Sequence, residues 1–209
     1  CDLSENVWQS IIDRSINSKV NSDNDRIQSL SKRYKSKGQA FELKEGHEFE
    51  GIIKYLSDKT GGNIHDNGTI EVTSNSIAGG SSSYHPKNLL DFNESNYYEA
   101  DGTDAWIRFD FKNRKINLTN YTIKSYDGGP NNHHLRSWKI EVSNDGEKWE
   151  KIDEHKDDPT LNGSRITGVF KVQPNGFSRY VRLYQTGVPW ISDCLWFYYL
   201  EFYGSLQEK

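Results

Sequence analysis

Residues 134–149, His-Leu-Arg-Ser-Trp-Lys-Ile-Glu-Val-Ser-Asn-Asp-Gly-Glu-Lys-Trp, carry the clearest structural pattern in the chain. From Trp138 to Val142 every second residue is apolar and the residues between are polar, which is typical of a strand with one buried face. The Asn-Asp-Gly sequence at 144–146 follows, and Asp-Gly supplies the positive φ angles that a tight hairpin turn needs. The apolar pattern resumes at Trp149 on a return strand. We therefore expect a β-hairpin in an all-β scaffold, which favours recognition over catalysis.

Similar short runs of alternating apolar and polar residues continue from Ile70 almost to the end of the chain, separated by Gly, Asn, Asp and Pro. This spacing is typical of a β-sandwich. The last run is apolar on both faces, as a central strand that is covered on both sides would be. The predicted strands are Ile70–Ser74, Trp106–Phe111, Tyr121–Ser125, Trp138–Ser143, Lys148–Ile152, Val169–Val172, Arg179–Gln185 and Leu195–Tyr203. We predict a mainly β protein in which residues 70–206 form an antiparallel jelly-roll β-sandwich.

The part of the chain before this region has a helical pattern. An apolar stripe over residues 3–16 predicts a helix, and the polar residues after it predict a loosely ordered linker. Apolar residues recur at helical spacing from Phe49 to Leu56 and predict a helix over about 47–60, with acidic residues near its start and Gly61-Gly62 at its end. The predicted divisions are a helical segment with a polar linker (1–37), a connecting helix (38–69) and the sandwich (70–206).

Composition limits the function. Only 33% of the 209 residues are hydrophobic, but 6 Trp, 12 Tyr and 9 Phe can fill a compact core with few side chains. The formal net charge of −4 gives no general attraction to phosphate backbones, so we expect no nucleic-acid partner. No apolar run is long enough for a membrane span. The chain starts at Cys1 and has no Met, so we expect a fragment or a processed form.

The two cysteines, Cys1 and Cys194, are too few for a disulfide framework and favour a reducing compartment. We therefore expect a cytoplasmic protein, or a secreted one if a signal peptide lies upstream. Five Asn-x-Ser/Thr glycosylation acceptors matter only in the second case. They lie at Asn67, Asn93, Asn117, Asn120 and Asn162.

Five motifs in this region come in a recognisable order. They are an Asp-x-Asn turn in His85–Asn93, the strand Trp106–Phe111, the Ser-x-Asp-Gly-x-x-Trp hairpin of 143–149, the strand Arg179–Leu183 and the closing strand Leu200–Gly204. Together they resemble the coagulation factor 5/8 C-terminal (discoidin-like) domain, and the resemblance implies a galactose-binding-like β-sandwich. The chain lacks the disulfide that usually joins the termini of extracellular members, and it has Phe92 where glycine is common. Both departures weigh against phospholipid binding.

A narrower resemblance involves His134-Leu-x-Ser-Trp-x-Ile-Glu, Leu161-Asn-Gly and Arg182-Leu-x-Gln-Thr-Gly187, with the upstream run Phe49–Asn63. These segments are similar to an intracellular branch found in protists, in which the domain follows a BTB–BACK region. The resemblance implies that the helix at 3–16 is the end of a BACK repeat. It also implies an adaptor role, with a ubiquitin-ligase substrate as one candidate partner.

The chain carries none of the catalytic motifs that we searched for, neither a Gly-x-Ser-x-Gly elbow, nor a P-loop, nor His-Glu-x-x-His, nor Cys-x-x-Cys. We therefore expect a protein that is not an enzyme and that needs no cofactor. Asp101 and Asp104 offer oxygen ligands for Ca²⁺, although a plain turn is the stronger interpretation. His133 and His134 are adjacent, so in an extended chain they face opposite ways and suit no shared metal.

The family resemblance implies that ligands meet the loops at one end of the sandwich. Aromatic faces there can stack on sugars or peptide side chains, and polar groups can give directional hydrogen bonds. For some members, such as the Asp and Asn of the early turn, holding the loop is the competing interpretation. The predicted ligand-binding residues are His85, Asp91, Asn93, Tyr97, Tyr98, Asp127, Asn131, His133, Arg136 and Trp190.

Two functions remain open. The first is a non-catalytic module that recognises a protein partner within a larger adaptor. The second is a carbohydrate-binding module, which the ring-rich loops and the glycosylation acceptors favour.

Overall fold

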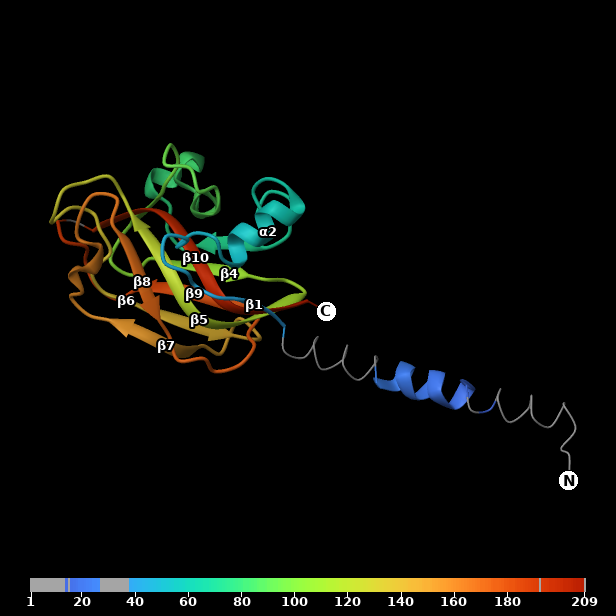
Figure 1. The fold of residues 1–209 in the computed structure, drawn as a ribbon. Coiled ribbons are helices and arrows are strands. Elements are labelled where there is room, and N and C mark those ends of the chain that lie inside the picture. The colour runs from blue at the N-terminus through green and yellow to red at the C-terminus, as the bar shows by residue number, and fades with distance from the viewer. Residues whose placement is uncertain (1–13, 15, 27–37, 192, 209) are drawn as a thin grey trace, which may run out of the picture. The chain divides into compact units, whose positions relative to one another are not determined.

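The computed structural model describes residues 14, 16–26, 38–191 and 193–208 (Figure 1). The chain forms two compact units, Cys1–Gln39 and Ala40–Lys209. In the first unit, residues 16–26 are α-helical and exposed. Most of the predicted helix over 3–16 lies outside the described residues. The linker predicted after it is wrong over 17–26, where Val20 follows Ile16 by one helical turn and continues the apolar stripe.

The second unit contains two five-stranded sheets that face each other (Figure 1). Sheet A has the order β1-β10-β5-β8, and β3 also pairs with β10. Its strands are β1 (Gln39–Phe41), β3 (Tyr98–Asp101), β5 (Arg114–Ser125), β8 (Thr167–Lys171) and β10 (Cys194–Glu208). Sheet B has the order β2-β4-β9-β6-β7. Its strands are β2 (Glu71–Ser74), β4 (Trp106–Asp110), β6 (Trp138–Ser143), β7 (Glu150–His155) and β9 (Tyr180–Gln185).

The antiparallel sandwich that the sequence predicts is confirmed. Each of the eight predicted strands overlaps an observed one, and β6 has the predicted bounds. The sequence pattern missed β1 and β3, which have three and four residues. β5 begins at Arg114, seven residues before the predicted strand start at Tyr121. A bulge between Tyr203 and Gly204 keeps the long β10 paired with β5 from one end of β5 to the other.

The hairpin at 138–155 is present, but its turn differs from the predicted one. Only Gly146 has a positive φ, of 77°, whereas Asp145 does not. The Asp145 carboxylate instead accepts hydrogen bonds from the backbone N–H groups of Glu147 (2.9 Å) and Lys148 (2.8 Å). These hydrogen bonds lower the pKa of Asp145. The connection is therefore a longer loop held by an aspartate, and β7 starts at Glu150.

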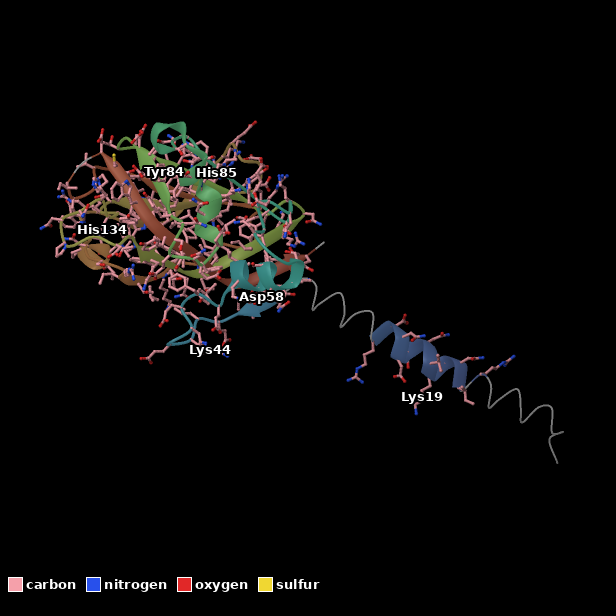
Figure 2. The ribbon with its side chains drawn as sticks, turned by 90° about the horizontal axis from the view of Figure 1, so that it is seen from above. Lys19, Lys44, Asp58, Tyr84, His85 and His134 are labelled. Atoms are coloured by element: carbon pink, nitrogen blue, oxygen red, sulfur yellow. The ribbon has the colours of Figure 1, made fainter. Side chains whose placement is uncertain are left out.

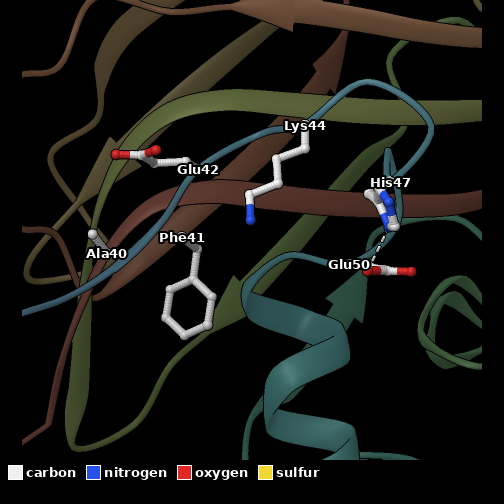
Figure 3. Close-up of a pocket in the computed structure, with 6 residues that line it drawn as sticks. All are labelled: Ala40, Phe41, Glu42, Lys44, His47 and Glu50. Atoms are coloured by element: carbon white, nitrogen blue, oxygen red, sulfur yellow. Dashed lines mark hydrogen bonds and ion pairs between the residues drawn. The ribbon is translucent and has the colours of Figure 1, made fainter.

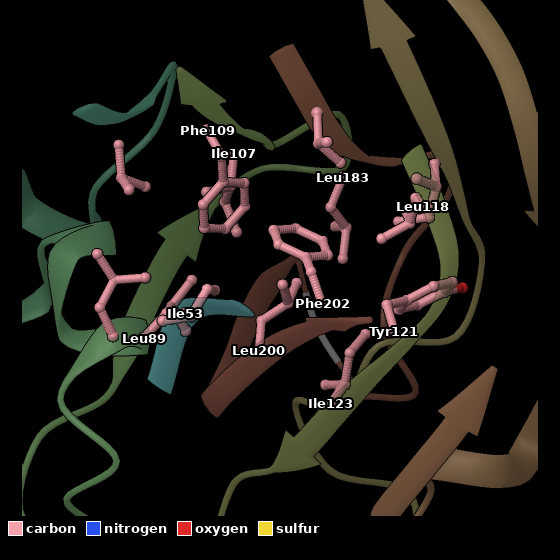
Figure 4. Close-up of a cluster of buried hydrophobic side chains, with 14 of the residues drawn as sticks. Ile53, Leu89, Ile107, Phe109, Leu118, Tyr121, Ile123, Leu183, Leu200 and Phe202 are labelled. Carbon is pink, nitrogen blue, oxygen red and sulfur yellow. The ribbon is translucent and has the colours of Figure 1, made fainter. Parts of the chain in front are cut away.

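The core lies between the sheets and is rich in rings (Figure 4). Phe202 of β10 packs edge-on against Phe109 of β4, with ring centroids 5.0 Å apart. Trp138 and Tyr121 are both fully buried, and the indole Nε1–H of Trp138 donates to the Tyr121 hydroxyl at 2.8 Å. Large rings therefore supply much of the apolar volume of the core, although the hydrophobic content of the chain is low.

The helix α2 (Ile52–Thr60) packs its buried residues Ile52, Ile53 and Leu56 into the same core. It starts five residues later than predicted, and its N-terminal N–H groups are capped by Glu201 of β10. This fully buried carboxylate accepts hydrogen bonds from the N–H groups of Gly51, Ile53 and Lys54 at 2.8–3.1 Å. Gly61 ends the helix as predicted, because its N–H bonds to the Ser57 carbonyl.

Short 3₁₀ segments complete the unit: η1 (Ala78–Gly80), η2 (Ser82–Tyr84), η3 (Pro86–Leu90) and η4 (Pro159–Leu161). The segment η3 packs on β10, β2 and β3. Figure 2 labels Tyr84 and His85 on this part of the chain and His134 on a separate loop. In the described part of the chain, no helix combines the length and the apolar character that a membrane crossing requires.

Candidate functional site

The outer side of sheet A carries a row of chemically active side chains where β3 meets the start of β10. Glu99 lies opposite Trp196 in the register, and Asp101 lies opposite Cys194. Side chains alternate along a strand, so Tyr98 and Ala100 point into the core while Glu99 and Asp101 point outward. The sheet therefore presents two carboxylates beside a tryptophan and the Cys194 thiol, which lies 3.5 Å from the Asp101 carboxylate.

Aromatic rings from three other segments gather around Trp196. The His133 ring stacks on it with centroids 3.9 Å apart and an angle of 27°. Tyr126 meets it edge-on at 4.9 Å, and Tyr97 lies 4.7 Å from Tyr126. All four side chains are half-buried. We call this group (Tyr97, Tyr126, His133 and Trp196) the ring platform.

Charged residues of neighbouring loops lie close to the platform. Arg165 pairs with Asp127 at 3.0 Å and with Glu94 at 3.2 Å, which ties three loops together. Ser164 also donates to Asp127, and this hydrogen bond is the main reason that the pKa of Asp127 is lowered. The backbone N–H of Asn131 donates to the Asn162 side chain at 2.6 Å. These contacts position polar groups beside the rings without using all of their hydrogen-bonding capacity.

Burial changes the acidity of two groups at the platform. It raises the pKa of Glu99, and the nearby Asp101 adds to the rise, while Trp196 and His133 oppose it. Burial also raises the pKa of Tyr97, with a further contribution from its hydrogen bond to Tyr84. Tyr97 therefore stays a neutral hydroxyl that can donate and accept. Glu99 accepts a proton more readily than an ordinary glutamate.

Glu99, Asp101 and Cys194 place their ligand atoms within 4.8 Å of one another. This is the one such group in the described residues, and it differs from the pair that the sequence suggested, because Asp104 is not part of it. Ca²⁺ takes six to eight oxygen ligands, whereas this group offers two carboxylates and a thiol. The donor set therefore does not fit calcium.

Four of the predicted site residues meet at the platform or its edge: Tyr97, Asp127, Asn131 and His133. Arg136 and Trp190 form a separate pair, with the guanidinium 4.7 Å from the ring centroid and a 2.7 Å ion pair from Arg136 to Asp157. The predicted divergence of the two adjacent histidines is observed. His133 lies on Trp196, and the buried His134 contacts the carbonyls of Gly128 and Gly129.

Three other predicted residues hold loops. His85 accepts the Lys87 backbone N–H at 3.1 Å and caps η3. Asp91 accepts a hydrogen bond from the Asn63 side chain at 2.5 Å, and Asn93 accepts the Ser95 backbone N–H at 3.0 Å. These geometries agree with the structural interpretation of the early loop.

Tyr98 needs a correction. It is fully buried, and its hydroxyl donates to the Ser76 carbonyl at 2.9 Å and lies 2.6 Å from the Ser74 hydroxyl. It therefore cannot be part of an exposed binding surface. The error arose because β3 was not predicted, and so the alternation that sends Tyr98 inward was not visible.

Four residues of the site were not predicted from the sequence: Glu99, Tyr126, Arg165 and Trp196. Trp196 lies in the run that was predicted to be buried on both faces, Leu195–Tyr203, and it is the one residue of that run that is only half-buried. The alternation of Leu195 and Phe197 with Trp196 and Tyr198 was the signal that could have shown it.

A different cavity, of about 210 Å³, lies near β1 and the start of α2 (Figure 3). Its lining includes Lys44, His47 and Glu50, and the His47 ring bonds to Glu50 at 2.8 Å. None of the predicted site residues lines it. It offers two rings, Phe41 and His47, against four at the platform, and the candidate site is therefore the ring platform.

The model of the F5/8 type C domain matches residues 69–199, which is more than half of the chain. Among solved structures, a CBM32 module from Clostridium perfringens in complex with GalNAc-β-1,3-galactose has a TM-score of 0.52 at 17% identity, covering 66% of this chain and 96% of that one. The family 32 CBM of NanJ from the same organism, in complex with galactose, has a TM-score of 0.52 at 9% identity, covering 65% and 94%.

The C-terminal domain of a chitobiase from Bacteroides fragilis has a TM-score of 0.53 at 19% identity, covering 66% of this chain and 95% of that one. At these identities the likeness concerns the fold. A comparison with curated proteins gave no match.

Proposed function

The chain belongs to the F5/8 type C domain family, a family of binding modules, and from this premise we propose that it binds a carbohydrate at the ring platform. The observation that carries the proposal is the cluster of half-buried rings beside Glu99, Asp127 and Arg165. Sugar C–H faces pack on aromatic rings, and sugar hydroxyls bond to carboxylates and guanidinium groups. A site with rings on one side and fixed polar groups at its edge suits both parts of a sugar.

The structural relatives support this proposal. Two of them are in complex with galactose or with a disaccharide that contains it, so this fold accommodates such ligands. Protein recognition, which the sequence analysis placed first, therefore becomes the second candidate here. The BTB–BACK context and the protist branch stay predictions, because neither the family model nor the structural relatives bear on them.

The compartment decides which glycans are available. A cytoplasmic location, which the sequence favours, restricts the ligand to intracellular glycans. A secretory location opens the extracellular ones.

The experiment is a glycan array followed by calorimetric titration of the strongest ligands. We expect Trp196→Ala to weaken binding more than tenfold, about 1.4 kcal/mol or more, and His133→Ala to weaken it less, because Trp196 is the larger ring and contacts both Tyr126 and His133. Trp149→Ala is the matched control, since Trp149 is also half-buried but follows β6 of the other sheet. We expect it to bind like the unmodified protein.

Two outcomes would count against the proposal. One is an array without any signal, in buffer with Ca²⁺ and in buffer with EDTA. The other is a set of ligands whose affinity is unchanged in Trp196→Ala and reduced in Trp149→Ala. Equal binding with and without EDTA is the result expected from a site whose donors do not fit calcium.

A further inference from the structure

The outer face of sheet B carries a second group of rings, with a different chemistry. In the register, Trp106, Tyr184 and Lys139 form one row across β4, β9 and β6, and Arg108, Arg182 and Glu141 form the next. Alternation places these side chains on the side away from the core. We call the following residues the cation–ring face: Trp106, Arg108, Lys139, Tyr180, Arg182 and Tyr184.

Cations lie over the rings of this region. The Arg182 guanidinium is 4.0 Å from the centroid of Trp149, and the Lys139 ammonium is 4.7 Å from that of Tyr184. The Arg179 guanidinium is 4.7 Å from Tyr180. A typical protein has about one such contact in 70–80 residues, so several on a single sheet face exceed the usual frequency. Because a cation lies over each of these rings, they present less open surface on which a sugar or a nucleobase can stack.

The cations differ in whether they have a carboxylate partner. Arg182 and Lys139 both pair with the buried Glu141, at 2.6 and 2.7 Å. Arg108 lies opposite Arg182 in the register, and its guanidinium is 5.8 Å from the Trp106 centroid and 5.9 Å from that of Tyr180. Among the described residues it makes no hydrogen bond and no close ion pair, and its carboxylate neighbour is Glu71, whose pKa it helps to lower. Its guanidinium therefore retains donors that match a carboxylate in a bidentate geometry.

The composition of the face is that of a protein interface. Trp, Tyr and Arg are the residues that are enriched where proteins meet and that dominate the binding energy there. Neither α2 nor any 3₁₀ segment packs on β4, β6 or β9 to a substantial extent in the described chain. The chain as a whole has a formal net charge of −4, so the excess of positive charge on this face is local and does not reflect the overall charge of the protein.

From these observations we propose that the cation–ring face is a docking surface for an acidic, extended polypeptide segment, one of whose carboxylates binds Arg108. The paired cations and the rings are already held in place, so little side-chain freedom is lost on binding. The partner's backbone lies along the flat sheet, and its apolar side chains pack against the ring edges. This surface is separate from the ring platform and does not depend on the carbohydrate proposal.

The experiment uses fluorescence anisotropy with labelled decaglutamate, and with decaglutamine and a ten-nucleotide oligothymidine as comparison probes. We expect decaglutamate to bind in low salt and to weaken as salt rises. Arg108→Glu should weaken this binding at least tenfold. Lys171→Glu makes the same change of charge on β8 of the other sheet, at an exposed lysine, and should change it less than twofold.

Arg108→Gln removes the charge without introducing repulsion and serves if Arg108→Glu does not fold. The proposal is overturned if decaglutamate binds no better than decaglutamine. It is also overturned if Lys171→Glu weakens binding as much as Arg108→Glu, because net charge alone would then explain the binding. Tighter binding of the oligothymidine, lost in Arg108→Glu, would instead assign the face to single-stranded nucleic acid.

Discussion

Replacing Tyr121 by phenylalanine tests the polar link at the centre of the core. The Tyr121 hydroxyl accepts the indole N–H of Trp138 at 2.8 Å and donates to the Asp153 carboxylate at 2.8 Å. Phenylalanine keeps the ring, so the stacking on Phe170 at 4.9 Å is retained and no large cavity forms. The change therefore removes two hydrogen bonds and little else.

The expected loss can be worked out from these two hydrogen bonds. The buried indole N–H of Trp138 is left without a partner, which costs about 1–3 kcal/mol. The hydrogen bond to the charged Asp153 contributes a similar amount. Because His155 still binds Asp153 at 3.0 Å, part of the second loss is recovered. We expect the free energy of unfolding to fall by about 3 kcal/mol, and the melting temperature by roughly 6–12 °C for a chain of this size.

Urea unfolding followed by tryptophan fluorescence measures this quantity. Tyr184→Phe is the control, because Tyr184 is half-buried and makes no comparable hydrogen bond, and its loss should stay within about 0.5 kcal/mol. A loss below about 1 kcal/mol for Tyr121→Phe, with an unchanged slope against urea, would show that these two hydrogen bonds do not stabilise the core. The Trp138 N–H would then have to find another partner.

Three further changes probe other parts of the fold. Gly204→Ala should cost at least about 2 kcal/mol in urea unfolding, because its φ is 136° and a Cβ would lie 2.1 Å from the Asn117 carbonyl, whereas Gly129→Ala, with no atom within 4 Å, should cost little. Arg182→Lys should cost about 1–2 kcal/mol, because lysine cannot both stack on Trp149 and bond twice to Glu141, and an unchanged midpoint would contradict this. Burial lowers the pKa of His85, so its contribution to stability is present above pH 6.5 and is lost as pH falls through the folded pKa. Burial alone would lower the pKa of His155 too, but Asp153 and Asp158 outweigh it and raise the pKa, so its contribution is present below pH 6.5 and is lost as pH rises through the folded pKa. NMR titration should place the two histidines on opposite sides of 6.5, and the reverse order would count against the assignment.

The sequence predicted those elements whose pattern repeats locally. Alternation along β4, β6 and β9 spans at least five residues in each strand, so one buried face was visible without the partner strands. β3 has four residues and begins directly after a polar loop, so its pattern is too short to distinguish from that loop. This omission affected the site prediction as well, because the alternation along β3 places Tyr98 in the core and Glu99 on the outer face.

The start of α2 shows a second limit. The sequence pointed to Glu48 and Glu50 as the acidic residues at the helix N-terminus, since they are close in sequence. The structure uses Glu201, which lies 148 residues after Ile53 in the chain. A pairing between such distant residues depends on how β10 crosses the unit, and no local pattern encodes it. The 3.6-residue spacing predicted the helix and Gly61-Gly62 predicted its end, whereas the start of the helix depends on tertiary structure.

The two aromatic surfaces of this domain differ in what covers their rings, and this difference separates their functions. On sheet B, guanidinium and ammonium groups lie over Trp149, Tyr180 and Tyr184, so an approaching ligand meets positive charge before it meets a ring. On sheet A, His133 and the tyrosines surround Trp196, and no cation lies over the platform rings in the described part of the chain. A neutral sugar gains from contact with uncharged rings, because its C–H groups displace only loosely held water there. A carboxylate gains on sheet B, where the Arg108 guanidinium retains donors that can bind it in a bidentate geometry. A glycan should therefore compete with another glycan but not with an acidic peptide, and this independence can be measured by titrating either ligand in the presence of the other.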